Sequence, residues 1–134
     1  DDPKAAASAR KVIFCSGKIY YQLIARQQQI SATDTAIVRV EQLYPFPEQM
    51  LRKIVGRYKK AASWLWVQEE PENMGAWQFI RSRLGALVKK QLVYVGREAS
   101  ASPATGFPKI YKVQQDGIVD RAVGSHDQAV SDSG

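Results

Sequence analysis

The sequence predicts an α/β fold with three layers, in which a mostly parallel sheet carries helices on both faces. Short apolar runs rich in β-branched and aromatic residues alternate four times with longer segments of helical spacing. Alternation at this spacing requires crossover connections between parallel strands. The apolar runs are nearly continuous, as expected for strands that are covered on both sides.

Four runs carry the strand pattern, and they span residues 11–16, 35–43, 62–70 and 91–96. Polar residues gather where each run ends. Because the carboxyl ends of parallel strands meet at one edge of a sheet, and ligands usually bind there, this edge is the expected location of a functional site.

Four segments are expected to be helices, and they span residues 17–30, 45–58, 73–90 and 109–123. In the second helix, Pro47 suits the first turn, and Met50, Leu51, Ile54 and Val55 form one apolar face. Tyr44, Pro45, Phe46 and Pro47 form the rigid corner that is expected before it.

In the third helix, Trp77 shares an apolar face with Ile80 and Leu84, so we expect its ring in the core. Asn73 is the expected N-cap, and Glu70 and Glu72 favour the positive end of this helix. Pro71 forbids a helical conformation to Glu70 and is expected to end the preceding strand.

The chain of 134 residues suffices for one domain with one core. We expect this domain over residues 11–123, after a disordered lead-in of residues 1–10 and before a disordered tail of residues 124–134. Residues 97–108 form a polar loop long enough to suggest a function.

Composition excludes several functional classes. The net charge is +6, but the basic residues do not alternate with aromatic residues in a stripe, so we expect a solvated basic surface and no nucleic-acid partner. No apolar run reaches the roughly 20 residues that a membrane span needs. One cysteine and one histidine cannot form a zinc site with the usual number of ligands.

Catalytic arrangements are also absent from the pattern. His126 lies in the expected tail, so no nucleophile and histidine can pair inside the fold. Cys15 could be a nucleophile at a strand end, although a space-filling role is the favoured interpretation. Glu69 and Glu70 should point to opposite faces of one strand and therefore do not form a catalytic pair. Trp64 and Trp66 share a strand face and are expected to pack against helices.

Several segments together resemble one enzyme family: "SGKIYY", "AIVRVEQLYPFP", "QEEPENMGAW" and "GREASASPATG". They are similar to the carboxyl-terminal domain of the 2-oxoglutarate dehydrogenase decarboxylase component, a relative of transketolase. The resemblance runs from about Lys11 to about Val123. It implies a fold like that of the transketolase carboxyl-terminal domain.

The resemblance implies a role inside a larger enzyme. That enzyme decarboxylates 2-oxoglutarate on thiamine diphosphate with Mg²⁺ and transfers the succinyl group to the lipoyl arm of a succinyltransferase component, in the tricarboxylic acid cycle. The diphosphate motif is absent here, so we expect a fragment that binds no cofactor and has no activity by itself. Its expected partners are the upstream domains, a second copy in a homodimer and the succinyltransferase. The expected location is the bacterial cytoplasm, or the mitochondrial matrix if the source is eukaryotic.

The resemblance also implies a regulatory site. Arg39 and Glu41 match the Arg-x-Glu of an allosteric pocket for a nucleotide-bearing effector in some bacterial members. We expect Arg39 and Arg97 to converge at the carboxyl edge, where Ser100 and Ser102 add hydroxyl groups. The alternative is that Arg39 and Glu41 only pair with each other.

Glu69 and Glu70 are candidates for contacts between domains or protomers, and capping with solvation is the equally weighted alternative. The competing hypothesis for the whole chain is a free-standing α/β binding module that recognises an acidic or phosphorylated ligand.

Overall fold

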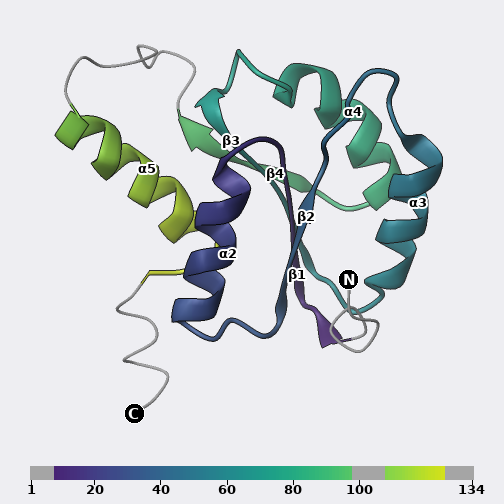
Figure 1. Cartoon of the computed structure of the whole chain (residues 1–134). Coiled ribbons are helices and arrows are strands. Elements are labelled where there is room, and N and C mark those ends of the chain that lie inside the picture. The colour runs from purple at the N-terminus through teal and green to yellow at the C-terminus, as the bar shows by residue number, and fades with distance from the viewer. Residues whose placement is uncertain (1–7, 98–107, 126–134) are drawn as a thin grey trace.

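The computed structural model describes residues 8–97 and 108–125. Strands and helices alternate along this part of the chain (Figure 1). The strands are β1 (Lys11–Cys15), β2 (Thr35–Arg39), β3 (Ser63–Pro71) and β4 (Leu92–Arg97). The helices are α2 (Ile19–Gln29), α3 (Glu48–Arg57), α4 (Trp77–Val88) and α5 (Pro108–Ala122).

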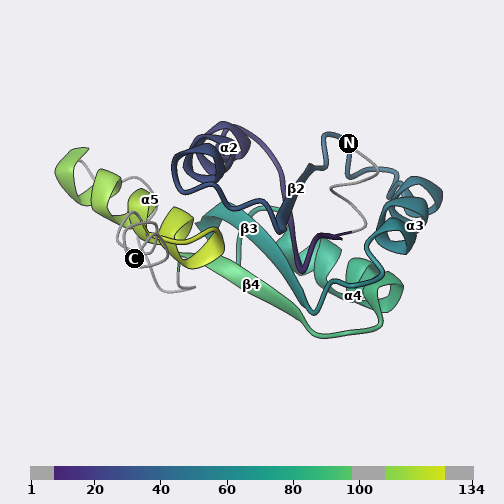
Figure 2. The same cartoon turned by 90° about the horizontal axis from the view of Figure 1, so that it is seen from below.

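The four strands form one parallel sheet in the order β2-β1-β3-β4. Helices α2 and α5 cover one face, and α3 and α4 cover the other, as the two views in Figures 1 and 2 show. After β2 the chain reverses its direction across the sheet to reach β3. Because parallel crossovers are right-handed, this reversal moves the connecting helix to the opposite face. The predicted three-layer α/β fold is therefore confirmed.

Side chains alternate between the two faces along each strand, which creates two separate cores. The α3–α4 core contains Phe14, Trp64, Trp66 and Trp77, so the expected packing of all three tryptophans is confirmed. The α2–α5 core is mainly aliphatic, and its buried members are Ile13, Cys15, Ile19, Leu23, Leu65, Val67, Val95, Ile118, Val119, Ala122 and Val123.

Several element boundaries differ from the sequence prediction. β2 ends at Arg39 rather than at residue 43, because the chain then leaves the sheet after the Val40 N–H donates to the Cys15 carbonyl at 2.8 Å. α3 begins at Glu48, and Met50 is 51% exposed instead of facing the core. The expected corner between them contains a cis Tyr44–Pro45 peptide bond.

Another difference is at the start of α4, which is Trp77 and not residue 73. β3 also runs through Pro71, where the sequence predicted that the strand would already have ended. Residues 72–76 form the turn between them. The reason lies in the contacts of Gln68, which are described below.

The ends of the described chain are attached to the domain. Ala9 is buried in the α3–α4 core, and the Arg10 carbonyl accepts hydrogen bonds from the Ala62 and Ser63 N–H groups. At the other end, the Gly124 carbonyl accepts a hydrogen bond from Arg26 at 2.8 Å. Most of the predicted lead-in and tail lies outside the described residues. Among the helices of the described part, none combines the length and the apolar character that crossing a membrane would need.

Candidate functional site at the carboxyl edge of the sheet

Gln68 is the polar centre of the corner between β3 and α4, although its side chain is only 2% exposed. Its Oε1 accepts hydrogen bonds from Trp66 Nε1 at 2.8 Å and from the Trp77 backbone N–H at 3.0 Å. Its Nε2 donates to the carbonyls of Glu70, Pro71 and Met74. One side chain thus satisfies buried groups on the strand, on the turn and on the helix.

This arrangement corrects the expected N-cap. Asn73 is exposed in the turn, and the residue before the helix, Ala76, makes no side-chain capping bond. The amide oxygen of Gln68 instead accepts from the first N–H of α4. A residue nine positions earlier takes the role of a cap because β3 and α4 pack against each other.

Two glycines allow the backbone to pass close to its neighbours at this corner. Gly75 has φ of +65°, and a Cβ there would collide with the Glu70 carboxylate. A Cβ at Gly96 would lie 2.8 Å from the Gln68 carbonyl oxygen and would also collide with the Tyr94 hydroxyl. The Tyr94 hydroxyl lies within hydrogen-bond distance of two carbonyl oxygens, that of Glu70 at 3.0 Å and that of Arg97 at 2.6 Å, and it can donate to either. It therefore bridges the irregular pairing between β3 and β4 beyond Val67.

Glu69 and Glu70 point to opposite sides, as the strand alternation predicts. Glu70 is exposed. Glu69 is partly buried, and its Oε1 accepts a hydrogen bond from Gln115 Nε2 at 2.7 Å. Glu69 therefore contacts α5 of its own domain, whereas the exposed Glu70 lies beside Gly75 at the turn before α4.

Arg97 joins Glu69 and Gln115 in one polar network beneath α5. Its Nη2 donates to Gln115 Oε1 at 3.0 Å and its Nε donates to Gln114 Oε1 at 3.1 Å. Its Nη1 donates to the Glu69 carbonyl. Gln115 is 3% exposed and also donates to Gln22 on α2 at 3.0 Å. This network holds β3, β4, α2 and α5 together at the carboxyl edge.

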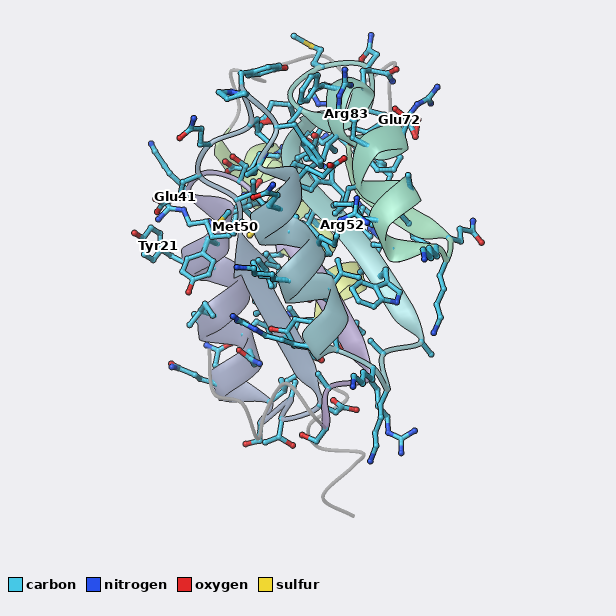
Figure 3. The ribbon with its side chains drawn as sticks, turned by 90° about the vertical axis from the view of Figure 1, so that its right-hand side faces the viewer. Tyr21, Glu41, Met50, Arg52, Glu72 and Arg83 are labelled. Atoms are coloured by element: carbon cyan, nitrogen blue, oxygen red, sulfur yellow. The ribbon has the colours of Figure 1, made fainter. Side chains whose placement is uncertain are left out.

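Arg39 lies at the other end of this edge, against two aromatic rings. Its Cζ is 5.2 Å from the ring centre of Tyr21 and 5.6 Å from that of Tyr20, and its Nη1 donates to the Tyr21 hydroxyl at 3.2 Å. Glu41 Oε1 is 3.6 Å from the same nitrogen. Figure 3 shows Tyr21 and Glu41 at this side of the molecule. The pairing of Arg39 with Glu41 is thus present alongside stacking on tyrosine, which the sequence did not indicate.

Arg39 and Arg97 do not converge, and that part of the prediction is wrong. β2 and β4 are the two outer strands of the sheet, with β1 and β3 between them. Strand order depends on how the crossovers pack, so an alternating pattern of strands and helices cannot determine it. Ser100 and Ser102 lie outside the described residues.

Exposed apolar side chains gather along the same edge. Tyr21 is in the first turn of α2, Tyr44 is in the corner after β2, Met50 is in the first turn of α3 and Met74 is in the turn before α4. Tyr44 is 65% exposed although its ring centre lies 4.3 Å from that of Phe79. We call these four side chains the apolar edge.

The described residues contain no group of three or more His, Cys, Asp or Glu side chains that could hold a metal ion. Cys15 is fully buried, and burial raises the pKa of its thiol to about 12. The thiol is therefore protonated and inaccessible, in agreement with the space-filling interpretation.

Comparison with known proteins identifies the domain. The family model described as 2-oxoglutarate dehydrogenase C-terminal matches residues 1–123. The chain belongs to this family. The resemblance of the four sequence segments is therefore confirmed over nearly the whole described domain.

Bacterial relatives support this assignment. The chain is 42% identical to a 2-oxoglutarate dehydrogenase E1 component of Rickettsia typhi over 85% of its length, and 39% identical to that of Haemophilus influenzae over 91%. It is 46% identical to an oxoglutarate dehydrogenase of Buchnera aphidicola over 82%. These matches cover 12% to 13% of the relatives' own lengths.

Proposed function

We propose that this chain acts as the carboxyl-terminal domain of a 2-oxoglutarate dehydrogenase E1 component, with a role in assembly and regulation. The observation that carries the proposal is the family match over residues 1–123, together with about 40% identity to E1 components. The fold supports it, because polar and exposed apolar groups both collect at one edge of the sheet.

The whole enzyme would oxidatively decarboxylate 2-oxoglutarate and succinylate a lipoyl group of its succinyltransferase partner. Thiamine diphosphate and Mg²⁺ would supply the decarboxylation chemistry in other domains. The described residues of this chain offer no site for that Mg²⁺, because they contain no group of three or more His, Cys, Asp or Glu side chains that could hold a metal ion. We place the enzyme, as a homodimer, in the bacterial cytoplasm.

The apolar edge is the surface that we assign to contact with the rest of the enzyme. Three of its four side chains, Tyr44, Met50 and Met74, lie around the starts of α3 and α4. Glu70 is exposed in the same region, whereas the Glu69 carboxylate accepts a hydrogen bond from Gln115 of the same domain. Of the two glutamates, only Glu70 is therefore retained as a candidate for an interdomain contact.

An assembly role can be tested in the full-length enzyme with the double variant Tyr44→Ser, Met50→Ser. We expect a weaker dimer and at least a tenfold loss of decarboxylation, measured by sedimentation velocity and substrate turnover. The matched control is Val113→Ser, which alters an exposed apolar side chain on α5. Equal behaviour of the double variant and the control would remove the apolar edge from the assembly surface.

We also propose that Arg39 contributes to an effector site in the full enzyme. Its side chain is 30% exposed, and its guanidinium is oriented by Tyr20, Tyr21 and Glu41. The site would be completed by groups outside this domain, since Arg97 lies at the far side of the sheet. Arg39→Ala should raise the concentration of a phosphate-bearing effector needed for half-maximal activation and leave basal turnover nearly unchanged. Identical activation curves would reject this role, and a parallel loss of basal turnover would indicate a structural one.

A further inference from the structure

The segment that contains α3, β3 and α4 carries most of the net positive charge of the molecule. Residues 48–90 contain nine Lys and Arg residues and four Glu residues, a net charge of +5 out of +6 for the whole chain. All nine basic side chains are exposed. After Glu48, neither α3 nor α4 contains a carboxylate.

Acidic and basic side chains of this segment gather at opposite ends of the two helices. Glu48, Glu70 and Glu72 lie at or before the starts of α3 and α4, at the carboxyl edge of the sheet. Both helices follow parallel strands and therefore run in the same direction, back toward the amino edge (Figure 1). Their ends bring several basic residues to that edge. We call this group the basic end, and its members are Arg10, Arg57, Lys59, Lys60, Lys89 and Lys90.

Hydrogen bonds show that three separate segments meet at the basic end. Lys90 Nζ donates to the Ala61 carbonyl at 2.9 Å, which ties the residues after α4 to those after α3. The Ala62 N–H donates to the Arg10 carbonyl at 2.8 Å, which places the residue before β1 beside them. The three segments that carry these exposed side chains therefore lie side by side.

Three lysines of this surface are not neutralised within the described part of the chain. Lys59, Lys60 and Lys89 take part in none of the ion pairs between described residues. The carboxyl ends of α3 and α4 each add roughly half a negative charge, which offsets only part of the charge of these three lysines. Basic side chains at helix ends do stabilise helices, but this effect does not account for Arg10, which precedes β1.

We propose that the basic end is a docking surface for an acidic segment of a partner protein. A phosphate site usually uses helix N-terminal N–H groups, whereas α3 and α4 present their carboxyl ends here. A single-stranded nucleic acid would need exposed rings for base stacking, but Tyr58 and Trp64, which lie close to Lys59 and Lys60 in sequence, are buried. Lysines on flexible stems act as point charges, which suits several carboxylates of a mobile acidic segment.

The expected action is mainly electrostatic steering. Charges within the Debye length of about 8–10 Å at physiological salt act together on an approaching partner, and such fields raise association rates by about 10- to 1,000-fold. Individual exposed pairs contribute little to affinity. The signature is therefore an association rate that depends on the basic end and falls with salt. This proposal is independent of the enzyme assignment, because it concerns a surface of the chain itself.

The test compares two triple variants of equal net charge. The patch variant is Lys59→Gln, Lys60→Gln, Lys89→Gln, and the control is Lys53→Gln, Arg81→Gln, Lys112→Gln, which removes three exposed cations elsewhere. Stopped-flow measurements would follow binding of labelled poly-L-glutamate at low salt. We expect association at least tenfold slower than wild type for the patch variant and changed less than twofold for the control. At about 500 mM salt, the association rates of the wild type and both variants should become equal.

Three results would overturn the proposal. Equal slowing in both variants would mean that only net charge matters, and unchanged association in the patch variant would mean that the basic end is merely solvated. Tighter binding of polyuridylate than of poly-L-glutamate, lost in the patch variant, would assign the surface to nucleic acid. Circular dichroism melting of each variant verifies that these comparisons are made on folded protein.

Discussion

The two faces of the sheet are built by different means. On the α3–α4 face, aromatic rings fill the core, and the ring centres of Trp77 and Tyr94 are 5.4 Å apart. On the α2–α5 face the core is aliphatic, and buried polar side chains tie the helices together. Arg26, 8% exposed, donates from α2 to Asp120 on α5 and to the Gly124 carbonyl.

This difference shows two ways of attaching a helix to a sheet. Large aromatic rings bury much apolar surface and need few specific partners. Their contribution to stability is therefore large and tolerates small shifts in the position of the helix. Buried polar groups contribute only when each donor and acceptor is satisfied, so their effect depends on geometry. Variants on the two faces should therefore differ in both size and character.

The largest effect is expected on the aromatic face. Trp77→Ala removes a buried ring from the first turn of α4 and should lower the free energy of unfolding by about 3–5 kcal/mol. Urea denaturation measures this loss, with Val113→Ala as a control at an exposed site. A midpoint that stays at the wild-type value would show that rings do not dominate this face.

The next largest effect concerns Gln68, which connects the aromatic core to polar contacts. Gln68→Ala leaves Trp66 Nε1 and the Trp77 N–H without their acceptor and should cost about 2–3 kcal/mol. The control is Gln78→Ala, which removes an exposed hydrogen bond to the Glu72 carbonyl. Similar losses in the two variants would argue against a central role for Gln68.

On the polar face, Arg26→Ala should lower the free energy of unfolding by about 1–3 kcal/mol, since it removes the contacts to Asp120 and Gly124. Asp120→Asn keeps an acceptor at the same place and should cost less than about 1 kcal/mol. Thermal melts of both variants give the two values. If Asp120→Asn lowers the free energy of unfolding as much as Arg26→Ala does, the charge of Asp120 rather than its hydrogen bond holds α2 to α5.

The smallest effect on stability at neutral pH comes from the titration of two groups, Cys15 on the α2–α5 face and Tyr94 on the α3–α4 face. Burial raises the pKa of Cys15 from 9.0 to about 12, and burial with nearby Glu72 raises that of Tyr94 from 10.0 to about 12. Each folded-state pKa lies above the unfolded value, so the stabilisation is complete below about pH 9 and is lost as pH rises toward 12. Unfolding free energies between pH 7 and 11 should therefore decline only above pH 9. A flat profile would contradict both shifts.

Thiol labelling provides a second measurement for Cys15 alone. At pH 8 a disulfide reagent should react with the native protein at least 1,000-fold more slowly than with protein in guanidinium chloride, since the thiol is both buried and protonated. Rapid labelling without denaturant would show that the α2–α5 face opens locally.

The amino-acid sequence by itself determined the class of fold and the family. The alternation of apolar runs and helical segments, the placement of Trp64, Trp66 and Trp77 in the core, and the corner around Pro45 all follow from local chemistry. Hydrophobic periodicity and the restrictions of proline operate over a few residues, so they can be read without knowing the neighbours.

Only the tertiary structure decided the arrangement of the site. The order of strands separated Arg39 from Arg97, the contact with Gln115 turned Glu69 toward its own domain, and Gln68 set the start of α4 in place of Asn73. The basic end likewise exists because α3 and α4 finish at the same edge of the sheet. Each of these results depends on groups far apart in the chain, and a hydrogen bond between such groups has no local signature in the sequence.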